Sequence, residues 1–312
     1  MNKSLKKNKG ILFLCVLFII LFIWLIFLGL NYQRQVIIDS HKQNLRIMAN
    51  EKASQVNMFL EMQKEKSLIL GSMDVFREVA MFPNDTTKIK AAKKLIDSLK
   101  DTVSGIGILT NKGIVIVSAD NPAGADYSSL PGFPVTNDNL NIRFTRYYDK
   151  QRKKDYYGVG GPIYDSNEKN NSIGVISFDV EFDKISELMK ETVESDGSEV
   201  YLIDDTGMLL SGSKYIGNGN KHGVLIQEVE SEGATLCLDD LKKYLKNGEF
   251  EEHEEKFLQY KNYMGDEVLG VHAYVQGIRG CVIAEEHTDE MIKLSFIDYI
   301  KNIFKKEAKD EK

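Results

Sequence analysis

The side chains best suited to bind a small molecule lie between residues 127 and 179, where tyrosines, arginines and an aspartate within an apolar run occur together. A ligand cavity needs aromatic surface for burial and a few convergent polar groups for orientation. A carboxylate in an apolar run is costly to bury without a partner. We therefore predict a ligand site at Tyr127, Phe133, Arg143, Arg146, Tyr147, Tyr148, Tyr156, Tyr157 and Asp179. Two alternatives remain: several of the tyrosines only cover a sheet, and the arginines lie at the surface.

Sequence motifs for catalysis, metal binding and nucleotide binding are not found. Leu210-Ser211-Gly212 lacks the first glycine of a nucleophile elbow, and the glycines of 158–161 do not open a helix as a phosphate-binding loop requires. Segment 165–171 lacks calcium-loop spacing and predicts a turn. Paired metal-ligand spacing is also missing among the histidines, which are His41, His222, His253, His272 and His287. We therefore expect that this protein is not an enzyme and that it binds neither a metal nor a cofactor.

The charge distribution argues against a nucleic-acid partner. The 312 residues carry a net charge of −6, with 43% apolar and 28% charged residues, as in a globular protein. The first ten residues hold four lysines and no acid, so the rest of the chain carries −10. Phosphate binding requires a basic face, which this acidic chain does not predict.

Residues 11–30 form an unbroken apolar run with one glycine. Twenty residues in a helix span about 30 Å, the thickness of the hydrocarbon core of a bilayer. The preceding lysines predict a cytoplasmic N-terminus, with everything after Asn31 outside the cell. A cleaved signal peptide is the alternative, but its apolar region is usually shorter and ends in small residues. We expect an uncleaved single-pass anchor in the cell membrane.

The hydrophobic pattern beyond the anchor changes from helical to strand-like. Apolar residues recur at helical spacing over 32–82, and a second helix is expected over 86–100, after the N-capping side chains of 84–86. A hairpin over 105–118 follows, then strands over 156–164 and 173–180 and a helix over 182–194. The same order repeats with a hairpin over 200–211 and strands over 257–263, 268–275 and 279–285. This predicts an α+β fold with two antiparallel sheet modules and one long shared helix.

Two of the three cysteines, Cys237 and Cys281, lie beyond the anchor in apolar, strand-like runs. One disulfide between them is compatible with an oxidising compartment. Buried free thiols are the commoner state in such runs, so we expect both to be reduced.

The order and spacing of these segments resemble the double Cache family of extracytoplasmic sensors, whose modules are PAS-like and occur on chemoreceptors and sensor kinases. The resemblance covers about 33–290, in the long helix and in three segments: GIGILTNKGIVIVSADNPAGADYSS, YYGVGGPIYDS with IGVISFDVEFDKI, and MGDEVLGVHAYVQGIRGCVIAEEHTDEM. It implies that the membrane-distal module, here about 101–190, binds the ligand.

Two departures from the family pattern limit what the resemblance implies. One subgroup binds amino acids through an arginine motif after the first hairpin and a later aspartate. Asp179 falls where that aspartate is expected, but Leu130 stands in place of the arginine that would pair with a carboxylate. Family receptors also continue through another membrane helix, whereas 291–304 carries three charges in fourteen residues and is expected to dock on the ectodomain or rest on the membrane surface.

The predicted organisation has six parts. These are a cytoplasmic tail (1–10), a transmembrane anchor (11–31), two ectodomain helices (32–100), a membrane-distal module (101–190), a membrane-proximal module (191–288) and a C-terminal helix with a polar tail (289–312). We expect a sensor of a small polar metabolite, such as an organic acid or an amine, that signals through a homodimer or a receptor partner. The alternatives are an envelope scaffold and a truncated receptor or kinase.

Overall fold

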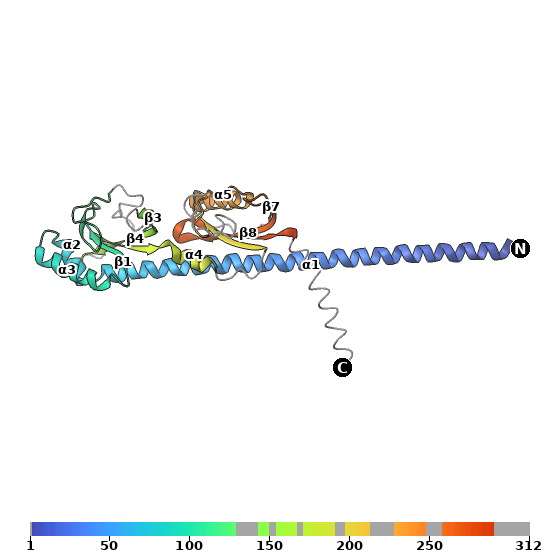
Figure 1. The fold of residues 1–312 in the computed structure, drawn as a ribbon, viewed down its shortest axis with the longest axis horizontal. Helices are drawn as coiled ribbons and strands as arrows, with labels where there is room; N and C mark the ends of the chain where they lie inside the picture. The colour runs from blue at the N-terminus through green and yellow to red at the C-terminus, as the bar shows by residue number, and fades with distance from the viewer. Residues whose placement is uncertain are drawn as a thin grey trace, which may run out of the picture.

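A computed structural model describes residues 2–128, 143–149, 154–166, 171–190, 197–212, 228–247 and 258–289. One helix, α1 (Asn2–Gly71), runs along the molecule, and two sheets lie side by side on its C-terminal half (Figure 1). Helices α2 (Asp74–Met81) and α3 (Thr86–Leu99) cover the end of the molecule farthest from the N-terminus. The chain is thus α+β with antiparallel sheets and a long helix.

The first sheet has the strand order β2-β1-β5-β4-β3. Its strands are β1 (Ser104–Leu109), β2 (Val115–Ser118), β3 (Arg143–Asp149), β4 (Lys154–Tyr164) and β5 (Ser172–Glu181). Helix α4 (Phe182–Lys190) follows β5 and leads towards the second sheet. We call this sheet, with the chain from α2 to α4, the first module.

The second sheet has the order β6-β9-β8-β7. Its strands are β6 (Ser198–Ile203), β7 (Leu258–Lys261), β8 (Glu267–Val275) and β9 (Gly280–His287); a short helix, η2 (Gln276–Ile278), joins β8 to β9. Helix α5 (Glu232–Asn247) packs on the face opposite α1 (Figure 1). We call this part, from β6 onwards, the second module. When the two strand orders are compared position by position, β1 corresponds to β6, β5 to β9, β4 to β8 and β3 to β7.

The turns confirm the internal repeat predicted from the sequence. In the first module Thr110 N–H donates to Ile114 O at 2.8 Å, and in the second Asp204 N–H donates to Met208 O at 3.0 Å. The glycine of each turn, Gly113 and Gly207, has a positive φ of 83° and 85°. Backbone in this region favours glycine because a Cβ would be strained, so both glycines serve the turn.

One face of α1 holds the two modules together. Leu45, Ala49, Val56 and Leu60 recur at helical spacing, are at most 2% exposed, and belong to a core that continues into both sheets. Helix α1 contacts β4 and β5 of the first module and β8 and β9 of the second. Both sheets therefore rest on a single rigid element.

The boundaries of the predicted helices are partly corrected by the structure. The helix expected over 32–82 ends at Gly71, where a Cβ would lie 2.9 Å from the carbonyl oxygen of Pro162, and a separate α2 follows. The predicted cap of α3 is confirmed, because the Asp85 carboxylate accepts hydrogen bonds from Thr87 N–H at 2.9 Å and Lys88 N–H at 3.3 Å.

The expectation of two free thiols is wrong. Cys237 and Cys281 form a disulfide, with their Cα atoms 6.6 Å apart. The apolar run around Cys237 is the buried face of helix α5 rather than a strand, and this face brings the thiol over β9.

Within the part of the chain that the structure describes, no helix is long and apolar enough to cross a membrane. The predicted C-terminal helix over 291–304 lies outside the described residues.

Candidate functional site

The face of the first sheet that points away from α1 carries the polar side chains of β5. Alternate residues Ile176, Phe178 and Val180 belong to the core shared with α1. Val175, Ser177 and Asp179 lie between them and therefore face the other way. Ser177 and Asp179 are only partly buried in the middle of this face.

Glycines surround Asp179 and Ser177 on this face. Gly158 on β4 pairs with Asp179, and Gly160 pairs with Ser177. On β1, Gly105 has φ +63°, and a Cβ built there would overlap the Asp179 carboxylate. Glycines on both flanking strands therefore place no side chains of their own beside Asp179 and Ser177 on this face.

Two of the predicted tyrosines lie on the same face as Asp179. Tyr127 packs at its edge against the cluster of Leu109, Val115 and Val175. Tyr156 is 2% exposed and pairs with Glu181, which is in phase with Asp179 along β5. The structure therefore brings Tyr127, Tyr156 and Asp179 to one side of the sheet.

Tyr157 lies on the opposite face. It is 4% exposed, belongs to the core shared with α1, and stacks on Phe182 with ring centroids 4.7 Å apart. Its side chain therefore packs in the core beneath α4 and does not share a face with Asp179.

The remaining predicted residues are placed by register only or lie outside the described part. On β3, Arg143 pairs with Gly160, Arg146 with Tyr157, Tyr147 with Tyr156 and Tyr148 with Asp155. Arg143 and Tyr147 are thus in the rows of the Asp179 face, whereas Arg146 and Tyr148 are out of phase with it. Phe133 lies outside the described residues.

A second group of polar residues, which the sequence reasoning missed, occupies the corresponding face of the second module. Glu199 and Glu285 pair across β6 and β9 and are 3% and 2% exposed. The tyrosines Tyr201 and Tyr260 donate hydrogen bonds to Glu285. The sequence alone could have indicated this group, because the repeat that aligns β5 with β9 also aligns Asp179 with Glu285. Among the described residues, no three potential ligands cluster as a metal site would require.

Comparisons with known proteins agree with this architecture. The family model for the Cache domain (dCache_1) matches residues 32–293. No curated protein matches the chain.

Solved sensor domains share the fold at low sequence identity. The ligand-binding domain of the Campylobacter jejuni chemoreceptor Tlp3, in complex with 4-methylisoleucine, has a TM-score of 0.58 at 16% identity, covering 82% of this chain and 94% of that one. The sensor domain of the V. cholerae histidine kinase DctB gives 0.57 at 10%, covering 82% and 99%. The ligand-binding domain of the Pseudomonas aeruginosa PAO1 amino-acid chemoreceptor PctB, with L-Arg, gives 0.54 at 13%, covering 81% and 97%.

The family model spans the long helix after residue 32 and both sheets, and the solved structures share that arrangement. The chain therefore belongs to the double Cache family of extracytoplasmic sensor domains.

Proposed function

We propose that this protein is a membrane-anchored sensor, not an enzyme, that binds a small polar metabolite on the first module. The observation that carries the proposal is the arrangement of Asp179 and Ser177 among Gly105, Gly158 and Gly160, on the face away from α1. Tyr127 supplies aromatic surface at the edge of this site. Tyr156 is buried on the same face, and Arg143 lies in a register row that crosses it. A carboxylate at the centre favours a ligand with an ammonium or another hydrogen-bond donor.

The bound ligands of the similar structures support a metabolite of this kind. The ligand is 4-methylisoleucine in the Tlp3 structure, L-Arg in the PctB structure and asparagine in the Mlp24 structure. For this chain an amino acid or an amine is therefore the first class to test. Organic acids form the second class, because Arg143 lies in a row of the proposed site.

The membrane anchor remains part of the proposal. Helix α1 extends well beyond both sheets towards the N-terminus (Figure 1). Large apolar side chains of this extension are exposed in the described structure: Phe18 is 71% exposed, Phe22 64% and Trp24 56%. Exposed apolar surface of this length favours a bilayer as its surroundings. The lysines before it favour a cytoplasmic N-terminus and an extracytoplasmic sensor.

A partner helix is the proposed route for the signal. Ile47, Met58, Met62 and Ile69 are 53–62% exposed and fall on one stripe of α1. At about 100° per residue, this stripe lies opposite the one that packs on the sheets. Such a stripe suits a second copy of the chain or a partner receptor. Crosslinking a Met62→Cys variant in membranes tests this, and a crosslink between copies supports the homodimer.

A binding screen on the full chain in detergent tests the ligand site. We expect at least one compound from a set of amino acids, amines and organic acids to raise the melting temperature in proportion to the logarithm of its concentration. Asp179→Asn should abolish the shift, and Asp239→Asn, an exposed aspartate on α5, should keep it. If no compound stabilises the protein, or if Asp179→Asn responds as the parent does, the site is not the one proposed, and the scaffold alternative gains weight.

A further inference from the structure

The internal repeat gives the second module a counterpart of Asp179. Ile173 on β5 is aligned with Arg279, the residue just before β9, and Asp179 and Glu285 each follow six residues later. Both acids face away from α1, and both pair with a glycine on the next strand, Gly158 in the first module and Gly270 in the second. The same repeat aligns Leu109 with Ile203, which carries Gly105 onto Glu199. Where the first module has a glycine beside its acid, the second has another acid.

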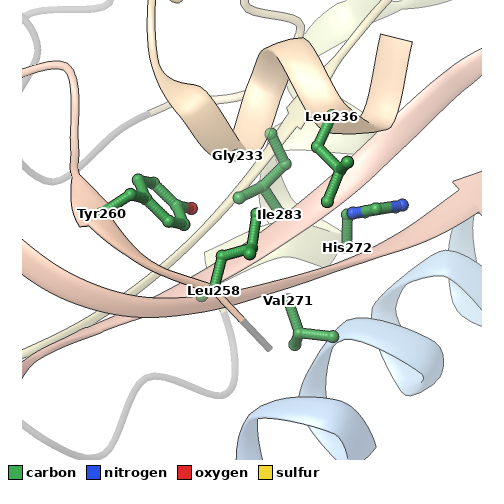
Figure 2. A pocket seen from close by; sticks show the side chains of 8 residues that line it. Gly233, Leu236, Leu258, Tyr260, Val271, His272 and Ile283 are labelled. Carbon is green, nitrogen blue, oxygen red and sulfur yellow. The ribbon is translucent and has the colours of Figure 1, made fainter. Parts of the chain in front are cut away.

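Tyrosines of the second module occupy the space beside this acid. Tyr201 O–H and Tyr260 O–H both donate to Oε1 of Glu285, at 2.7 and 2.6 Å. The Tyr260 hydroxyl points into the pocket between Gly233 on α5 and Gly270 on β8 (Figure 2), where a Cβ on either glycine would overlap it. The pocket that remains has room for about one water molecule. A metabolite does not fit beside Tyr260.

One oxygen of the buried Glu285 carboxyl is not compensated by a hydrogen bond among the described residues. Glu285 and Glu199 are direct neighbours across two strands on one face, where like charges repel. Glu199 accepts a hydrogen bond from the Tyr263 hydroxyl. Oε2 of Glu285 is buried and has no hydrogen-bond partner, and no ion pair of Glu285 exists among the described residues. One bound proton would remove one of the two charges.

We propose that the second module carries a binding site for a single proton, formed by Glu285 with Glu199, and that this site gives the sensor a response to pH that is separate from the metabolite site. Burial raises the pKa of Glu285 to about 7, hydrogen bonds from Tyr260 and Tyr201 lower it, and the charge of Glu199 raises it. The proton is therefore exchanged near neutral pH.

The other titratable groups around Glu285 are tyrosines, acids and histidines. Burial raises the pKa of Tyr201, Tyr260 and Tyr274, so these phenols stay neutral and act as donors. The described groups on this face, element by element, are Glu199 and Tyr201 on β6, Tyr260 and Tyr263 on and after β7, His272 and Tyr274 on β8, Glu232 and Asp240 on α5, and His287 on β9.

The site is one residue away from a contact with α1. Glu286 points to the opposite face of β9, where its Oε2 lies 2.8 Å from Nδ1 of His41 on α1. A rearrangement of β9 on loss of the proton would therefore reach α1 directly. This route does not pass through the first module.

The sign of the pH effect follows from the raised pKa. Unfolding returns Glu285 to its ordinary pKa of 4.5, so between that pH and about 7 the folded protein holds a proton that the unfolded chain releases. The stabilisation is complete below pH 4.5 and is lost as the pH rises through about 7. The melting temperature should therefore fall between about pH 5 and about pH 8 by more than in Glu285→Gln, which mimics the protonated acid.

Infrared spectroscopy of the full chain in detergent tests the proton directly. We expect the carbonyl band of a protonated carboxylic acid at about pH 6 that disappears by about pH 8. Glu285→Gln should remove this band, whereas Glu267→Gln, an exposed glutamate on the same sheet, should keep it. Glu199→Gln should move the transition to lower pH, because one source of repulsion is gone.

Two results would overturn the proposal. The first is a wild-type spectrum in which every glutamate is ionised at about pH 6, a measurement that needs no variant to fold. The second is a titrating band that persists in Glu285→Gln. The metabolite screen is read separately, so a failure of either proposal leaves the other standing.

Discussion

Gly105→Ala offers a sharp test of the proposed metabolite site, because it changes the backbone and the Asp179 carboxylate together. Gly105 has φ +63°, a region that costs an L-residue about 1–2 kcal/mol. The new methyl would also overlap the Asp179 carboxylate and lie 3.0 Å from its Cβ. Displacing a packed group in this way costs about 1–3 kcal/mol. The free energy of unfolding should therefore fall by about 2–5 kcal/mol.

A matched variant separates the two contributions. Gly124 also has a positive φ, +84°, but a Cβ there meets nothing within 4 Å. Gly124→Ala should therefore lose only the backbone part, about 1–2 kcal/mol. In an Asp179→Ala background, where only the Cβ of residue 179 remains, the cost of Gly105→Ala should approach that of Gly124→Ala.

Urea unfolding of the full chain in detergent, followed by the near-ultraviolet circular dichroism of its tyrosines, measures these differences. Gly105→Ala should also lose binding of whichever compound the screen identifies, and Gly124→Ala should keep it. If Gly105→Ala costs no more than Gly124→Ala, or if the Asp179→Ala background leaves its cost unchanged, the carboxylate does not lie over Gly105 and the geometry of the site is wrong.

Three further predictions concern stability. Reducing the Cys237–Cys281 disulfide, which spans a sequence separation of 44, should lower the free energy of unfolding by about 4 kcal/mol in denaturant titrations, and a Cys15→Ser variant should show the same loss on reduction. Asp85→Ala should cost about 1 kcal/mol by removing the cap of α3, whereas replacing the exposed Asp101 should change the unfolding midpoint little; equal effects would argue against the cap. Tyr157→Ala should cost about 3–5 kcal/mol by emptying the space under Phe182, and a loss below about 1 kcal/mol would contradict its placement in the core.

The sequence predicted those parts of the fold that local chemistry determines. The strand over 173–180, the glycine turns and the Asp85 cap depend on residues within a few positions of one another, and each is confirmed. Strand β3 and helix α5 were missed. Helix α5 was mistaken because an apolar run around Cys237 fits a strand as well as one face of a helix. Only its packing on the second sheet distinguishes the two.

The site was harder to predict because it depends on which face each strand turns to the core. Tyr156 and Tyr157 are adjacent and chemically alike, yet one lies beside Asp179 and the other under Phe182. Register decides between them, and it is set by partners far apart in the sequence. Glu285 is the last residue of the strand predicted over 279–285, and its burial depends on β6 and β8, which lie on either side of β9.

The continuity of α1 has a mechanical consequence. Its 70 residues form a rod about 105 Å long, to which both sheets are clamped near one end. If α1 tilts by a single degree about its contact with the first module, the part of the helix near residue 28, about 65 Å away, moves by roughly 1 Å. A movement of either module against α1 would therefore also move the N-terminal part of this helix. Binding of a metabolite by the first module and of a proton by the second would then act together on the same helix.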